Sequence, residues 1–152
     1  MSRKTIIVIV SLVLLGGLSF YLNRERFQSA PIEIGDRSLQ PRDGMAKRFK
    51  DSRSNPVIFL LNRELRLTSV KVLLASAVET NRYTVPIWNL TSASNSVPVK
   101  DFIYGMNIPG MKPSVKGAVA DPLEPGVRYR VQIQAGSLEA EHDFVPVPKT
   151  AR

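Results

Sequence analysis

The chain of 152 residues contains no cysteine and a single histidine, His142. The absence of cysteine excludes thiol catalysis, disulfide bonds, cysteine-based zinc sites and a lipid anchor on cysteine. Nucleophile–base pairing for acyl transfer would have to depend on that one histidine. The sequence also has no glycine-rich phosphate loop and no Walker motif. We therefore expect a protein that is not an enzyme and that uses no cofactor.

His142 stands between Glu141 and Asp143, a cluster that could suggest a metal site. In a strand, successive side chains point to opposite faces. The two carboxylates would then share one face while the histidine points to the other, so the three do not converge on an ion. We expect no metal site here, only a solvated polar strand edge.

The net charge of +8 is spread along the chain rather than gathered in one segment. Arg3 and Lys4 contribute +2, and residues 23–55 and 56–152 contribute +3 each. A nucleic-acid-binding domain usually concentrates its positive charge on one face. This distribution argues against nucleic acid as a partner. The basic composition leaves one alternative function open, a secreted binder of an anionic polymer such as a polysaccharide or a nucleic acid.

Residues 5–22 (TIIVIVSLVLLGGLSFYL) are eighteen residues without a charge. They follow Arg3 and Lys4 and precede Arg24 and Arg26. As a helix with about 1.5 Å rise per residue they would extend about 27 Å, close to the ~30 Å hydrocarbon core of a bilayer. The sequence therefore predicts that residues 1–22 form a membrane anchor, with residues 5–22 in contact with the membrane.

A cleaved signal peptide is the alternative for residues 1–22, with Gly17 and Ser19 as the small residues before the cut. The apolar run continues past them to Leu22, and an aromatic pair beside arginines is typical of a retained span. Lysine and arginine flank both sides of the segment, so they do not decide the orientation alone. We favour a single-pass protein whose C-terminal domain is exported, into the periplasm or the extracellular space.

Residues 23–55 contain few apolar residues and several turn formers. Such a segment buries too little surface to offset the entropy of ordering, which predicts a flexible tether. Within it, residues 45–53 could form a basic helix on anionic lipid headgroups or a solvated linker. Residues 56–148 would form the folded domain, and residues 149–152 a short tail.

Short apolar runs with turn residues between them predict strands in the domain, and together an all-β sandwich. Within residues 64–74 the alternation shifts by one position, which predicts a β-bulge. A helix is the competing interpretation for the leucine-rich residues 57–78. The clearest element is a hairpin in which inward and outward side chains alternate and Gly136-Ser137 forms the turn. The expected strands are residues 57–61, 64–74, 83–89, 99–104, 127–135 and 138–147.

Residues 123–135 (LEPGVRYRVQIQA) resemble the end of a fibronectin type III domain, with its L-x-P-G-x-x-Y-x-V pattern. The resemblance implies a tyrosine corner: Pro125 and Gly126 form the turn, and the buried Tyr129 reaches back to the backbone through its hydroxyl. It also makes Trp88 the core tryptophan of the family's second strand and residues 102–104 the third. The resemblance covers residues 64–147, with residues 57–61 as an extra strand. It implies an immunoglobulin-like sandwich.

The remaining aromatic residues are expected in the core, so a partner would bind on loops. The candidates are residues 92–98 and 104–113, because loops on a rigid sandwich often carry the binding residues. In the second loop, Tyr104, Met106, Ile108 and Met111 form the possible partner-binding set. The sequence thus predicts a non-enzymatic, membrane-tethered sandwich that contacts an unidentified protein at the cell envelope.

Overall fold

A computed structural model describes residues 3–22, 30–40, 47, 49, 52–81, 83–93 and 96–149. The chain divides into two compact units, residues 1–31 and 32–152, which we describe separately. Most of the basic segment 45–53 and the end of the predicted tail lie outside the described residues.

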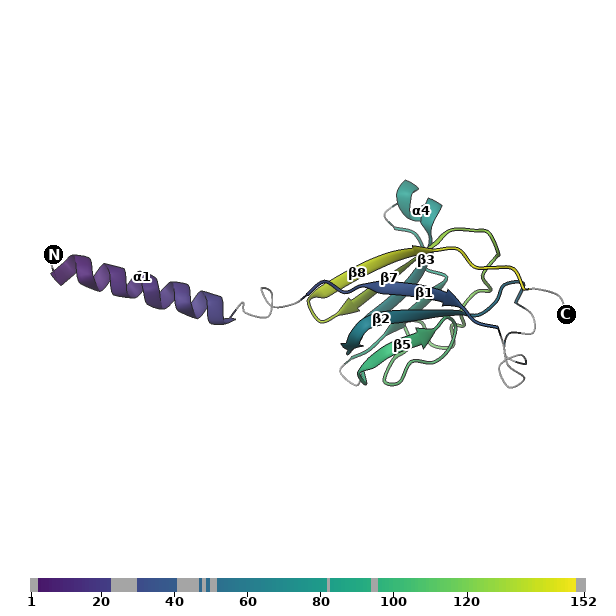
Figure 1. Cartoon of the computed structure of the whole chain (residues 1–152), viewed down its shortest axis with the longest axis horizontal. Coiled ribbons are helices and arrows are strands. Elements are labelled where there is room, and N and C mark those ends of the chain that lie inside the picture. The colour runs from purple at the N-terminus through teal and green to yellow at the C-terminus, as the bar shows by residue number, and fades with distance from the viewer. Residues whose placement is uncertain are drawn as a thin grey trace. The chain divides into compact units, whose positions relative to one another are not determined.

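The first unit contains one helix, α1 (Arg3–Leu22) (Figure 1). Its described side chains between Thr5 and Ser19 are all exposed, and most of them are Ile, Val or Leu. The sequence predicts a membrane-spanning helix here. In the described part of the chain, no helix has the combination of length and hydropathy that crossing a membrane requires.

The second unit is an all-β sandwich of two antiparallel sheets, as the sequence predicts (Figure 1). One sheet has three strands in the order β1-β2-β5 and the other has five in the order β6-β4-β3-β7-β8. A short helix, α4 (Ala75–Thr80), follows β3. The strands are β1 (Ile34–Ser38), β2 (Val57–Leu65), β3 (Ser69–Leu74), β4 (Trp88–Thr91), β5 (Val99–Ile103), β6 (Lys112–Pro113), β7 (Tyr129–Ala135) and β8 (Leu138–Phe144).

Aromatic side chains from both sheets meet in the core. The ring of Phe59 on β2 lies 5.2 Å from Phe102 on β5 and 4.9 Å from Phe144 on β8, between ring centroids. Trp88 on β4 packs edge-on against Tyr104 at 5.1 Å. Such pairs add to the burial of apolar area that drives folding. The sandwich is therefore held by a single core that both sheets line.

The predicted C-terminal hairpin is confirmed. β7 and β8 pair from Tyr129 with Phe144 to Ala135 with Leu138. Gly136 in the turn has a φ of +64°, a conformation that glycine adopts at low cost. β5 agrees with the strand predicted over residues 99–104.

The prediction of a flexible tether over residues 23–55 is wrong for described residues between 32 and 54. β1 lies in this segment and pairs with β2, from Ile34 with Leu61 to Ser38 with Val57. Ile32 belongs to the core, and Ser54 is buried and donates a hydrogen bond to the carbonyl of Leu123, at 3.1 Å. The folded unit thus begins near residue 32, because backbone pairing with β2 orders a segment whose own apolar content is low.

The strand predicted over residues 64–74 is also wrong, because its two halves belong to different sheets. β2 extends to Leu65 in the three-stranded sheet, and β3 begins at Ser69 in the other. The shift in alternation therefore marks a crossing between the sheets, where the buried Leu67 enters the core. A register irregularity does occur, within β2 between Leu60 and Leu65.

The strand predicted over residues 83–89 begins only at Trp88. Residues 75–80 form α4, and its first four residues fall in the stretch 57–78 where strands were favoured over a helix. Pro86 precedes β4, in keeping with the missing N–H that proline cannot give to a ladder. Trp88 lies in the fourth strand, and Phe102 in the fifth. Residues 102 and 103 of the predicted strand 102–104 thus belong to β5, and Trp88 is the first residue of β4.

Candidate partner-contact surface

Three of the four residues predicted to form a partner-binding set have side chains that point into the core, which argues against direct contact with a partner. Tyr104 (6% exposed), Ile108 and Met111 are buried core residues, and only Met106 is partly exposed. Gly105 and Gly110 have φ values of +73° and +78° and make two tight turns. These turns fold the loop back on itself and bring its apolar side chains into the sandwich.

The residues that the sequence assigned to structural roles lie in the core or in the turn before β7. Tyr129 is buried, and its hydroxyl oxygen accepts a hydrogen bond from the backbone N–H of Glu124 at 3.1 Å. Pro125 and Gly126 make the preceding turn, with a φ of +79° at Gly126. Trp88 is in the core. The hydroxyl of Tyr129 thus reaches back to the backbone just before the turn.

A second buried tyrosine, Tyr104, holds the segment that contains Asp121. The sequence did not indicate this contact. The Tyr104 hydroxyl donates to the backbone carbonyl of Asp121 at 2.7 Å. Burial, with the nearby charge of Asp121 and the neighbouring Tyr129, raises the pKa of Tyr104 far above its ordinary value, so the phenol remains a donor. The backbone N–H of Asp121 donates to the carbonyl of Ile87 at 3.1 Å. Both backbone groups of Asp121 are therefore fixed.

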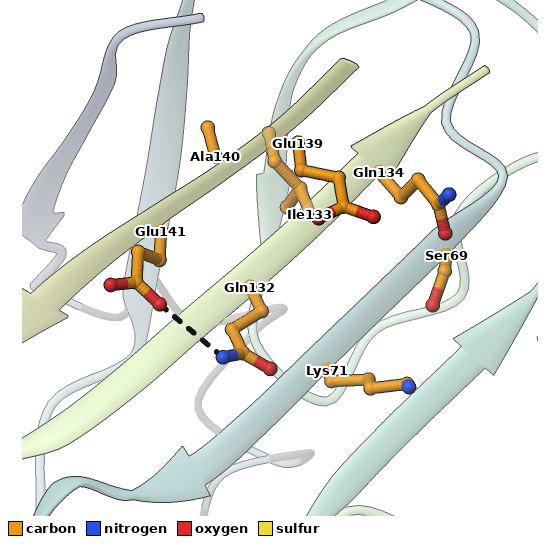
Figure 2. Close-up of a pocket in the computed structure, with 8 residues that line it drawn as sticks. All are labelled: Ser69, Lys71, Gln132, Ile133, Gln134, Glu139, Ala140 and Glu141. Atoms are coloured by element: carbon orange, nitrogen blue, oxygen red, sulfur yellow. Dashed lines mark hydrogen bonds between the residues drawn. The ribbon is translucent and has the colours of Figure 1, made fainter. Parts of the chain in front are cut away.

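The outer face of the five-stranded sheet carries a shallow polar pocket of about 270 Å³. Figure 2 shows its polar side chains standing on β3, β7 and β8, with Gln132 donating to Glu141 at 3.3 Å. Its polar lining consists of Ser69, Lys71, Gln132, Gln134, Glu139 and Glu141. This set contains neither an aromatic platform nor a histidine. The arrangement is that of a solvated sheet face.

Ion pairs run along the same face beside this pocket. The Arg130 guanidinium donates to both carboxylate oxygens of Asp143, at 2.6 and 3.0 Å. This pair raises the pKa of Arg130 and lowers that of Asp143. Arg128 pairs with Glu79 of α4 at 2.8 Å. These cationic side chains are thus already matched by carboxylates.

His142 points to the face of β8 opposite to Asp143, as strand alternation predicts. Its Nε2 lies 2.7 Å from Oδ1 of Asp36 on β1. β1 and β8 are the edge strands of their respective sheets, so this contact links the two sheets along one edge. His142 therefore contributes to the closure of the sandwich rather than to a cluster with Glu141 and Asp143.

Apolar side chains face outward beside β4. Val85 and Val119 are 82% and 84% exposed, and Val115 is also exposed. Together with Ile87 and Ala118 they line a groove of about 360 Å³, which we call the valine groove. Exposed apolar groups that cluster around a depression commonly mark a contact site.

A second groove of about 370 Å³ adjoins the first and is called here the Tyr104 groove. Val57, Tyr104, Ala120, Pro122 and Leu123 are among its lining residues. The two grooves share Val119 and Asp121. We take them together as the candidate contact surface.

The grooves were not predicted, and the sequence holds only a faint signal of them. Val115, Ala118 and Val119 are apolar in a segment with neither strand nor helix periodicity. The comparisons supply no further assignment: no family model matches the chain, and neither a curated protein nor a solved structure is significantly similar to it.

Proposed function

We propose that this chain is a membrane-tethered, immunoglobulin-like module that acts without catalysis, by contacting another protein through the valine groove and the Tyr104 groove. The observation that carries the proposal is the exposure of Val85, Val115 and Val119 around one depression. Fully burying such a side chain is worth roughly 1.5–3 kcal/mol. A partner that covers three valines therefore gains substantial free energy.

The strand order supports an immunoglobulin-like assignment. In that fold, strands A, B and E share one sheet, and G, F and C share the other, which C′ can extend. The order β1-β2-β5 corresponds to A-B-E, and β8-β7-β3-β4 to G-F-C-C′. The corner hydrogen bond of Tyr129 is a second point of support. The chain differs in having β6 outside β4 and, among the described residues, no D strand.

The sequence of residues 5–22 supports attachment to a membrane. A helix that is apolar around its whole circumference is expected in a protein core or in lipid. The described Ile, Val and Leu side chains of α1 are exposed. In this proposal residues 5–22 stay attached to a membrane, and the sandwich lies in the exported compartment. Cleavage after Ser19 is the alternative that the experiment below also tests.

The place where the chain enters the sandwich leaves the grooves accessible. β1 begins with Ile34 opposite Leu61, towards the end where residues 66–68 lead from β2 into β3. The grooves lie towards the opposite end, beside residues 85–88 and 119–121. A module tethered through Ile32 can therefore offer the grooves to a partner.

Binding of an anionic polymer, the alternative from composition, is not favoured by the two arginines on the outer sheet face. Arg128 and Arg130 on the outer sheet face are paired with Glu79 and Asp143. Both grooves are lined mainly by apolar side chains. We therefore keep protein contact as the single proposed function.

Site-specific photocrosslinking in cells that express the full chain tests this proposal. A photoreactive amino acid at Val119 is expected to give a discrete protein adduct that stays in the membrane pellet after an alkaline carbonate wash. The matched control is the same amino acid at Glu139 on the polar sheet face, which should give no adduct.

Two results would count against parts of the proposal. Equal crosslinking from both positions, or none from Val119, would contradict contact through the grooves. A soluble mature chain that begins near Phe20 would instead show that residues 1–19 are a cleaved signal peptide.

A further inference from the structure

Asp121 lines both grooves and is the one charged residue among the described residues that line them. The other described lining side chains are neutral, and most are apolar. The Asp121 side chain is exposed, and no ion pair joins it to another described residue. Asp121 is therefore the charge that the described lining of the two grooves offers to a partner.

The backbone that carries this carboxylate is fixed at both of its polar groups. Asp121 donates its N–H to Ile87, and its carbonyl accepts from the Tyr104 hydroxyl. Ile87 precedes β4 and Tyr104 follows β5, so the segment is tied to both sheets. A ligand that pairs with Asp121 then has to order only this side chain and not the backbone that carries it, which favours affinity.

We propose that the valine groove, Asp121 and the Tyr104 groove together bind a segment of a partner protein that carries Lys or Arg between two apolar side chains. The apolar side chains fill the grooves and the cation pairs with Asp121. In an extended segment every second residue shares a face, so the expected pattern is apolar, any residue, Lys or Arg, any residue, apolar. This inference rests on the proposed function and names the chemistry of its partner.

Charge argues against a second copy of this chain as the occupant. Two copies related by a two-fold axis present the same surface to each other. An interface through the grooves would bring Asp121 towards Asp121 of the second copy, and like charges at an interface are unfavourable. A segment with a cation is instead complementary to this site.

The test uses the full chain in detergent micelles and a phage-displayed library of random peptides. Enriched peptides are expected to contain Lys or Arg flanked by apolar residues. For the best peptide, Asp121→Asn should weaken binding about threefold to fivefold, the range of exposed ion pairs. Asp121→Glu keeps the charge and should stay within about twofold. Asp101→Asn on β5 is the matched control and should leave the dissociation constant unchanged.

The apolar part of the site has its own variant pair. Val119→Ser should weaken the same peptide about tenfold, because it removes apolar surface from both grooves. Val97→Ser changes an exposed valine in a different loop and should have no effect. Thermal unfolding verifies that each variant is folded, which we expect of Asp121→Asn because both clamps on Asp121 involve its backbone.

The outcomes separate this inference from the proposed function. Enriched peptides without a basic residue, or an Asp121→Asn variant that binds as tightly as the parent, would overturn the cation-binding inference. If Val119→Ser still weakened such peptides and Val97→Ser did not, contact through the grooves would stand. If these two valine variants behaved alike, the proposed contact surface itself would be wrong. A dimer that Val119→Ser dissociates would overturn the inference in favour of a second copy.

Discussion

Residues 104–111 and residues 115–119 are neighbouring segments that both contain several apolar residues. Most apolar side chains of the first segment lie in the core, whereas those of the second face outward. Tyr104, Ile108 and Met111 are buried, whereas Val115 and Val119 are exposed. The first segment is folded inward by the turns at Gly105 and Gly110. The second is fastened at its ends, by Ser114 to Asn89 and by Asp121 to Ile87. Backbone fastening, rather than composition, decides which apolar side chains reach the core.

The largest expected effect comes from opening a cavity under the inner segment. Ile108→Ala and Met111→Ala should each lower the free energy of unfolding by about 2–4 kcal/mol, through lost burial and residual cavity. Urea denaturation of the full chain measures both. A loss below about 1 kcal/mol at either position would break the comparison, since the residue would then behave as a surface side chain.

An intermediate effect is expected from the two tyrosine hydroxyls. Tyr129→Phe leaves the N–H of Glu124 without its acceptor, and Tyr104→Phe leaves the carbonyl of Asp121 without its donor. Each change should cost about 1–2 kcal/mol in the same denaturation experiment. Tyr104→Phe should also weaken the groove-binding peptide, because it releases the backbone of Asp121, whereas Tyr129→Phe should not. Equal peptide affinities in the two variants would show that the Tyr104 hydroxyl does not contribute to binding in the grooves.

The smallest effect on stability is expected in the outer segment. Val115→Ser and Val119→Ser should change the free energy of unfolding by no more than about 0.5 kcal/mol, the usual range for surface substitutions. The peptide-binding effect of Val119→Ser would then be separate from folding. A stability loss comparable to that of Ile108→Ala would mean that the valines pack against the sandwich and are not free for a partner.

The regular part of the sandwich could be predicted from local pattern. In β7, the inward residues Tyr129, Val131 and Ile133 alternate with polar ones, and the turn residues at Gly126 and Gly136 mark where the chain reverses. Both signals act over a few residues, so they are visible in one sequence. The strand content of the C-terminal half and the corner tyrosine follow from them.

The misplaced elements depend on distant pairing. β1 has the sequence Ile-Gly-Asp-Arg-Ser and becomes a strand because β2 lies beside it. Likewise, only the position of the second sheet shows that Leu67 marks a crossing and not a bulge. The grooves are harder still, because the exposure of Val115 and Val119 depends on which other apolar residues already fill the core. The sequence shows that a loop residue is apolar, but it does not show whether that side chain is buried or exposed.

The pairing of β1 with β2 has a mechanical consequence. The chain enters β1 at one end of the sandwich. The C-terminal segment is held at the other end, where the backbone N–H of Lys149 donates to the backbone carbonyl of Arg53. Tension between the helix and a partner held at the far end would therefore pull β1 lengthwise along β2. The five registered residue pairs from Ile34 to Ser38 then share the force in shear, instead of separating one after another as in an unzipped ladder.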